Sequence, residues 1–276
     1  MTGRPVSLHI GAHKTASTHL QKTLEHNVDL LSEHGIGWLG PVQLRREGKP
    51  LSRRLKAGFS GILPEARRLV ISEENLMGLQ FSPVGNELLY PQAERRAGKL
   101  FDRIGGTDVT VFLSVRDPAP WLASLYAHEL FNGQVKPGFY AFLGNVRPAD
   151  LRWAKLVRRL QIAGANRVVV WRQEDYSAVL PDLLPLMLGT PLPIVSIENR
   201  VNASLSAEAI AMLEALGPGR EDPRKSARQA KKAFPVRGPE DRFRPFSADT
   251  LAASAEAYAD DLEALADLED VTLLRP

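Results

Sequence analysis

Near the start of the chain, one lysine and three hydroxyl-bearing residues lie close together in a stretch that reads LHIGAHKTASTHL, residues 8–20. Lys14 supplies a mobile positive charge with three hydrogen-bond donors. Hydroxyl groups follow it at Thr15, Ser17 and Thr18. These residue types at this spacing are suited to binding the oxygens of a phosphate or sulfate group.

The elements on either side of this stretch are expected to hold its donors in place. An apolar run from Val6 to Ile10 predicts a buried strand, and Gly11 then permits a sharp exit. Ser17 and Thr18 can cap a helix whose apolar positions recur from Leu20 to Leu31. Backbone N–H groups at a helix start, with the positive end of its dipole, favour an anion. The sequence therefore predicts a strand, an anion-binding loop and a helix.

The loop departs from the Walker pattern G-x-x-x-x-G-K-[ST] of nucleotide-triphosphate enzymes. Gly11 and Thr18 occupy its first and last places, but Ala16 stands at the second glycine and Ser17 at the lysine. The lysine is instead inside the loop, at Lys14. The missing Walker lysine argues against a P-loop kinase.

This arrangement resembles the loop P-K-[ST]-G-[ST]-[ST] of sulfotransferases, matched here by residues 13–18. The resemblance implies that the loop binds the 5′-phosphosulfate of 3′-phosphoadenosine 5′-phosphosulfate (PAPS). Its implied cofactor-binding residues are Lys14, Thr15, Ala16, Ser17 and Thr18. Ala16 replaces the family's usual glycine and is expected to be strained if its φ is positive.

A second segment carries an arginine and a serine eight residues apart. A predicted buried strand, Val109 to Val115, is followed by RDPAPWLASLY, residues 116–126. This segment resembles the sulfotransferase element R-[ND]-P-x-x-x-x-x-S-x-Y, whose arginine and serine bind the 3′-phosphate of PAPS. The resemblance assigns this role to Arg116 and Ser124. A planar guanidinium suits it, because its donors can meet two phosphate oxygens at once.

Two neighbouring glutamates follow a third predicted strand, Arg68 to Ser72. Sulfuryl transfer needs in-line positioning, stabilisation of the departing phosphate oxygen and a base for the acceptor's proton. Lys14 is suited to the second task. Glu73 and Glu74 are the candidate bases, with a pKa raised by partial burial. Several carbohydrate sulfotransferases use a glutamate here, whereas a glutamate that caps a helix or pairs with an arginine is the structural alternative. His13 is a further candidate for contact with the phosphate or the acceptor.

The order of elements, together with the resemblance, predicts an α/β fold of three layers, with a P-loop-NTPase-like central parallel sheet and helices on both faces. The predicted strands are Val6–Gly11, Arg68–Ser72, Val109–Val115, Arg167–Trp171 and Val271–Leu274. Ligands gather at the carboxyl ends of parallel strands, so the three polar clusters are expected to meet in one crevice. We expect a single domain, residues 1–276, in which the basic segment 217–246 is either a lid or a solvated loop.

Composition excludes several other classes of protein. The chain has 276 residues and no cysteine, which excludes a disulfide framework, a cysteine nucleophile and a cysteine-ligated zinc site. No run of 18 apolar residues and no signal-peptide core occur, so we expect a cytoplasmic protein without a membrane span. The formal charge of +3 gives no indication of nucleic-acid binding, and no metal-ligating constellation is present.

Three hypotheses of function follow from these observations. The first is a PAPS-dependent sulfotransferase that acts on a hydroxyl, less often an amine, of a carbohydrate or small-molecule acceptor, releases 3′-phosphoadenosine 5′-phosphate (PAP) and requires no metal. The second is a P-loop kinase, which would need magnesium and ATP. The third is a catalytically silent relative that binds a nucleotide or glycan. The acceptor and the oligomeric state are left open by the sequence.

Overall fold

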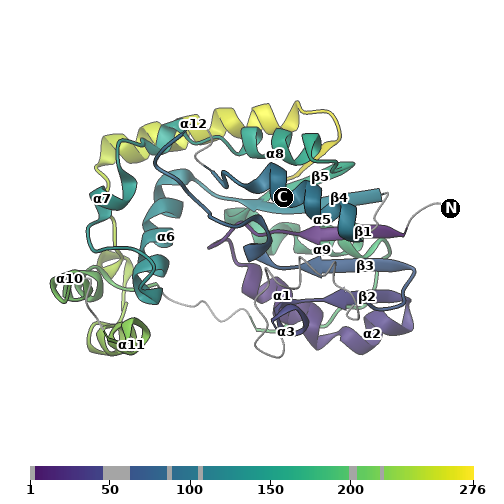
Figure 1. The fold of residues 1–276 in the computed structure, drawn as a ribbon, viewed down its shortest axis with the longest axis horizontal. Helices are drawn as coiled ribbons and strands as arrows, with labels where there is room; N and C mark the ends of the chain where they lie inside the picture. The colour runs from purple at the N-terminus through teal and green to yellow at the C-terminus, as the bar shows by residue number, and fades with distance from the viewer. Residues whose placement is uncertain (1–3, 46–62, 86–88, 105–107, 199–203, 218–220) are drawn as a thin grey trace. The chain divides into compact units, whose positions relative to one another are not determined.

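The structure is a computed structural model that describes residues 4–45, 63–85, 89–104, 108–198, 204–217 and 221–276 (Figure 1). The chain forms two compact units. The first comprises Met1–Arg116, Arg152–Asn199 and Asp260–Pro276, and the second comprises Asp117–Leu151 and Arg200–Ala259. The expectation of a single domain stays a prediction.

The first unit is built on a six-stranded sheet with the strand order β2-β3-β1-β4-β5-β6, in which every neighbouring pair is parallel (Figure 1). The strands are β1 Pro5–His9, β2 Ile36–Leu39, β3 Arg68–Ser72, β4 Asp108–Val115, β5 Arg167–Arg172 and β6 Val271–Leu274. At the carboxyl end of β1, His9 is paired with Ser72 on one side and Phe112 on the other. The ends of β1, β3 and β4 therefore lie next to one another, where the polar clusters begin.

All five strands predicted from the sequence are present, and the α/β class with a central parallel sheet is confirmed. β2 is the strand that the sequence does not predict. It has four residues, IGWL, and contains Gly37 between two further glycines, Gly35 and Gly40, so its composition is typical of a turn. It is nevertheless fully buried, and Trp38 packs in the core.

Helices cover both faces of this sheet. Those of the first unit are α1 Ser17–His26, α2 Val28–Glu33, α3 Pro41–Leu44, α5 Ala93–Ile104, α8 Trp153–Ile162 and α9 Tyr176–Leu188, with a 3-10 turn, η2, at Glu74–Met77. Apolar side chains of α1, α2 and α9 form one buried cluster with the sheet, which includes Leu24, Val70, Phe112 and Leu183. The connection from β1 to β2 runs toward one edge of the sheet, whereas those from β3 to β4 and from β4 to β5 run toward the other. Right-handed crossovers therefore place α5 and α8 on the face opposite α1, which gives the three predicted layers.

The second unit is helical. It contains α6 Pro118–Asn132, α7 Phe139–Leu143, α10 Ala207–Ala215 and α11 Pro223–Ala233, and α12 Ala248–Ala266 begins in it. Asp117 caps α6 by accepting from the Ala119 N–H at 3.1 Å, and it also accepts from the hydroxyl of Ser254 on α12 at 2.5 Å. Of the candidate lid, 217–246, residues 218–220 lie outside the described residues, and the rest contains α11. Its role as a lid stays a prediction. Across the described ranges, no helix has both the length and the apolar character needed to span a membrane.

Candidate functional site

The loop that follows β1 is held against the ends of two other strands. The Ile10 N–H donates to the Phe112 carbonyl at 3.2 Å, and the Ala12 N–H donates to the Ser114 carbonyl at 3.0 Å, so pairing with β4 continues beyond β1. Gly11 has a φ of 102°, and a Cβ there would lie 3.2 Å from the Cβ of Glu74. Glycine is therefore required at this position for both its φ and the space, and the loop lies directly beside Glu74.

The backbone of the loop alternates in a way that favours an anion. Lys14 and Ala16 have positive φ angles of 64° and 65°, whereas Thr15 between them does not. Such alternation turns successive N–H groups toward one side and forms a concave anion site. In the part of the chain that the structure describes, the N–H groups of residues 15–18 donate to no protein acceptor. The loop and the first turn of α1 thus present a set of backbone donors.

The hydroxyls of the loop are used differently. Thr15 Oγ1 donates to the Ala12 carbonyl at 2.6 Å, and Ser17 Oγ donates to the same oxygen at 3.2 Å. Both residues are buried, whereas Thr18 is exposed on the first turn of α1. In this structure the hydroxyls of Thr15 and Ser17 therefore stabilise the loop. The half-buried Lys14 is the cationic residue of the loop.

Ala16 has the conformation in which a glycine is expected. It precedes α1 with φ 65° and ψ 14°, in the left-handed region, and its side chain makes no capping hydrogen bond. The strain anticipated from the sequence is thus present in the backbone. The loop therefore has an alanine in the backbone conformation that a glycine would adopt.

Arg116 connects the second motif to the loop. It lies directly after β4, and its Nη1 donates to the Lys14 carbonyl at 3.3 Å. The Arg116 carbonyl in turn accepts from Trp153 Nε1 at 2.8 Å, which fixes the backbone at this point. Two motifs about a hundred residues apart therefore meet within the first unit. Ser124 belongs to α6 of the second unit, where it is half-buried.

Glu73 is fully buried, and both of its carboxylate oxygens are occupied. Arg45 donates to them through Nε at 2.7 Å and Nη2 at 2.6 Å, a bidentate pair. The N–H and the side-chain amide of Asn75 both donate to Oε1, at 3.0 Å and 2.7 Å. Glu73 thus both caps η2 and pairs with an arginine, which are the two structural roles expected as the alternative for these glutamates.

Glu74 is less enclosed, and its side chain is 21% exposed. It accepts from Gln21 Nε2 at 2.8 Å and from Arg45 Nη2 at 3.4 Å. Burial acts to raise the pKa of Glu74, but the hydrogen bonds from Gln21 and from its own N–H, with the charges of His13 and Arg45, lower it overall. The expectation of a raised pKa is therefore wrong for this carboxyl.

His13 is buried in the loop and held at both ring nitrogens. Nδ1 lies 2.9 Å from the Tyr90 hydroxyl, and Nε2 lies 3.2 Å from Oδ1 of Asn75, whose amide group faces Glu73. Because this amide oxygen can only accept, Nε2 carries the proton and Nδ1 accepts from Tyr90. Burial is the main cause that lowers the pKa of His13 from its ordinary value. The hydrogen bonds link the loop to Glu73 through Asn75.

Sequence reasoning did not single out the residues that support this site. They are Gln21, Arg45 and Tyr90. Gln21 carried a usable signal, since it lies one helical turn after Ser17 on the buried side of α1. Arg45 and Tyr90 carried none. Among the described residues, no group of three or more acidic or histidine side chains is placed to hold a metal ion.

No family model and no curated protein matches the chain. A solved sulfotransferase from Alicyclobacillus acidocaldarius is similar with a TM-score of 0.42 and 16% identity, over 72% of this chain and 87% of that one. A retinol dehydratase, solved with androsterone and the inactive cofactor PAP, gives a TM-score of 0.35 and 14% identity, over 99% and 83%. The chain is structurally similar to these proteins, and at such identities the similarity concerns the fold.

Proposed function

We propose that this protein is a sulfotransferase that takes the sulfuryl group from PAPS and passes it to a hydroxyl, less often an amine, of a carbohydrate or small-molecule acceptor. One observation carries the proposal: Arg116 donates to the carbonyl of Lys14, at the loop whose N–H groups form an anion site. PAPS carries anionic groups at both ends of its ribose, and one lysine and one arginine from separate strand ends are suited to these two groups.

Each cation has its own task in this proposal. Lys14 and the N–H groups of residues 15–18 bind the 5′-phosphosulfate, and Lys14 stabilises the charge that develops on the departing phosphate oxygen. Arg116 binds the 3′-phosphate, and the part that the resemblance implies for Ser124 stays a prediction. The acceptor oxygen bonds to sulfur while the bond from sulfur to the 5′-phosphate oxygen breaks, and PAP is released.

Glu74 is the better candidate for the base that takes the acceptor's proton. Both oxygens of Glu73 are already held by Arg45 and Asn75, and its side chain is inaccessible. Glu74 is partly exposed and lies beside Gly11 of the loop. We assign His13 a positioning role, because both of its ring nitrogens are engaged by other side chains.

The competing hypotheses differ in the nucleotide they require. A P-loop kinase would prefer ATP with magnesium, and a silent relative would bind a ligand without turnover. The glycine-like conformation of Ala16 supports an anion site that remains competent to bind despite the substitution.

The proposal is tested by calorimetric titration of the full chain with PAP, and separately with ATP and magnesium. We expect PAP to bind in the micromolar range and ATP at least tenfold more weakly, and Lys14→Ala to weaken PAP binding. Lys22→Ala is the matched control, because Lys22 is an exposed lysine on α1, the helix that follows the loop. Preference for ATP would support the kinase, and binding of neither nucleotide would refute the proposal.

A further inference from the structure

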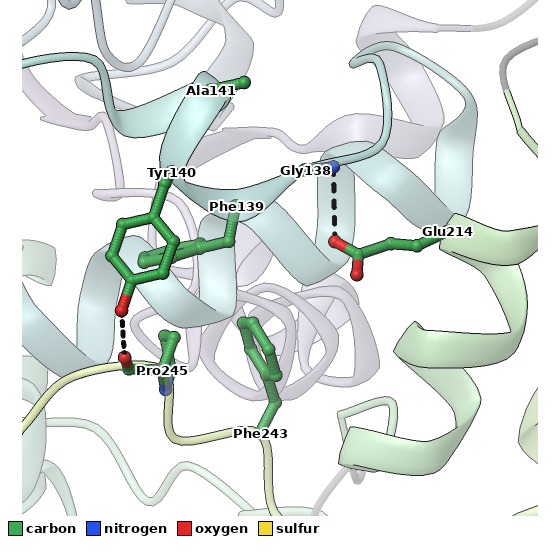
Figure 2. Close-up of a pocket in the computed structure, with 7 residues that line it drawn as sticks. All are labelled: Gly138, Phe139, Tyr140, Ala141, Glu214, Phe243 and Pro245. Atoms are coloured by element: carbon green, nitrogen blue, oxygen red, sulfur yellow. Dashed lines mark hydrogen bonds between the residues drawn. The ribbon is translucent and has the colours of Figure 1, made fainter.

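The second unit contains an aromatic pocket of its own, with a volume of about 440 Å³ (Figure 2). Its walls come from α7, from α10 and from the segment that precedes α12. The side chains that matter here are those of Phe139, Tyr140, Glu214 and Phe243. Its volume lies in the range of small-molecule sites, and all of its lining belongs to one unit.

Three aromatic rings form the apolar part of this pocket. The Phe139 ring packs edge-on against Phe243 and against Tyr140, with centroid separations of 5.6 Å in both pairs. Tyr126 of α6 contacts Phe139 edge-on at 5.4 Å. The Tyr140 hydroxyl donates to the Pro245 carbonyl at 2.8 Å, which ties α7 to the segment that carries Phe243. These contacts fix the rings before any ligand is bound.

One carboxylate lies among these rings. Glu214 Oε1 accepts a short hydrogen bond from the Tyr126 hydroxyl and a second from the Gly138 N–H at 3.2 Å. Figure 2 shows this oxygen directed toward Gly138 and the other oxygen turned away from it. In the described part of the chain, no donor is recorded for Oε2. The carboxylate is therefore held in place by one oxygen, while the other remains available to a ligand.

We propose that this pocket binds an organic ammonium ion, with the charged nitrogen at Glu214 and the apolar body against Phe139, Tyr140 and Phe243. Aromatic faces attract a cation, and a carboxylate accepts charge-assisted hydrogen bonds from an ammonium group. The same carboxylate repels a phosphate or sulfate. Arg242 and Arg244 flank Phe243 in the sequence and alternate with it along the chain. Both are exposed, and neither is among the residues that line the pocket. The inference does not depend on the nucleotide proposed for the first unit.

The experiment compares two probes that differ in one group, phenethylammonium and 2-phenylethanol, by calorimetry or ligand-observed NMR with the full chain and no nucleotide. We expect the ammonium to bind at least about tenfold more tightly than the alcohol, the size expected when a cation–π contact and a charge-assisted hydrogen bond are both gained. Equal affinity for the two probes, or binding of neither, would overturn the proposal.

Two variants and one control locate the effect. Glu214→Gln keeps an oxygen acceptor for Tyr126 and Gly138 but removes the charge, so the preference for the ammonium should disappear while binding of the alcohol is retained. Glu208→Gln removes an exposed carboxylate from the same helix and should change neither affinity. Phe243→Leu gives an independent reading, since it keeps an apolar side chain but removes one π face, and it should weaken ammonium binding several-fold. An unchanged preference in both Glu214→Gln and Phe243→Leu would place the ammonium elsewhere.

Discussion

The loop of residues 11–18 and the pocket around Glu214 present opposite chemistry. The loop offers backbone N–H groups, Lys14 and the nearby Arg116, all suited to an anion. The pocket offers aromatic rings and a carboxylate, suited to a cation. The loop is built from consecutive residues at a strand end, whereas the pocket is assembled from α7, α10 and a later segment. Binding at the loop and binding at the pocket can therefore be altered separately.

The largest expected effect is a loss of catalysis that a change in the loop causes and that leaves binding in the pocket unchanged. Lys14→Ala should lower the rate of PAP release from PAPS by about a thousandfold, because the negative charge that develops on the departing oxygen is no longer stabilised by a cation. The rate is measured with an acceptor found by screening. Binding of phenethylammonium in the second unit should not change. If Lys14→Ala turns over PAPS at the original rate, Lys14 is not the group that stabilises the departing oxygen.

A second expectation distinguishes the two neighbouring glutamates. Glu74→Gln should lower turnover by about a hundredfold, as loss of a general base does, without a comparable loss of stability. The pKa of Glu74 is lowered from its ordinary value, so this carboxyl stays ionised and the rate should stay level from pH 5.5 to pH 8 as far as it is concerned. A fall in rate with a midpoint near pH 6.5 would indicate a base with a raised pKa.

A third expectation concerns stability and compares one arginine from each unit. Arg45→Ala leaves the buried Glu73 without its bidentate partner and should lower the free energy of unfolding by about 2 kcal/mol. Arg147→Ala removes a pair with Asp150 in which both side chains are exposed, and should leave the free energy of unfolding nearly unchanged. Urea denaturation measures both. Equal losses of stability in the two variants would mean that the burial of Glu73 does not add to the contribution of its ion pair with Arg45.

The smallest expected effect tests the strain at Ala16. Ala16→Gly should raise the free energy of unfolding by up to about 1 kcal/mol, because glycine adopts the left-handed conformation without a clash, and it should not weaken PAP binding. Ala211→Gly, at an exposed helical position in the second unit, should instead destabilise by about 1 kcal/mol. A loss of stability in Ala16→Gly would show that the loop carries no such strain.

The sequence predicted those features that depend on residues close to one another along the chain. Gly11, Lys14 and Ala16 lie within one strand-to-helix connection, so their spacing alone indicates an anion loop and a strained alanine. Arg116 could also be placed, because it follows a long buried strand and the carboxyl ends of parallel strands meet at one edge.

What the sequence did not predict depends on tertiary contacts. The pairing of Glu73 with Arg45 requires the short strand β2, which its glycines conceal. The lowered pKa of Glu74 results from Gln21, His13 and Arg45, which approach it only in the fold. The pocket around Glu214 joins residues that are 76 and 105 positions apart in the sequence, and no local pattern could reveal it. The cytoplasmic location and the absence of nucleic-acid partners stay predictions.

The most direct test is the contribution of the 3′-phosphate, measured by calorimetric titration with PAP and with adenosine 5′-monophosphate, which lacks that group. The unchanged chain should bind PAP at least tenfold more tightly, because Arg116 meets the 3′-phosphate. Arg116→Ala should remove most of this preference and leave the affinity for adenosine 5′-monophosphate nearly unaltered. Arg167→Ala, at the opposite end of the sheet, should preserve the preference. Equal affinity of the unchanged chain for the two nucleotides would contradict the assignment of this site to PAPS.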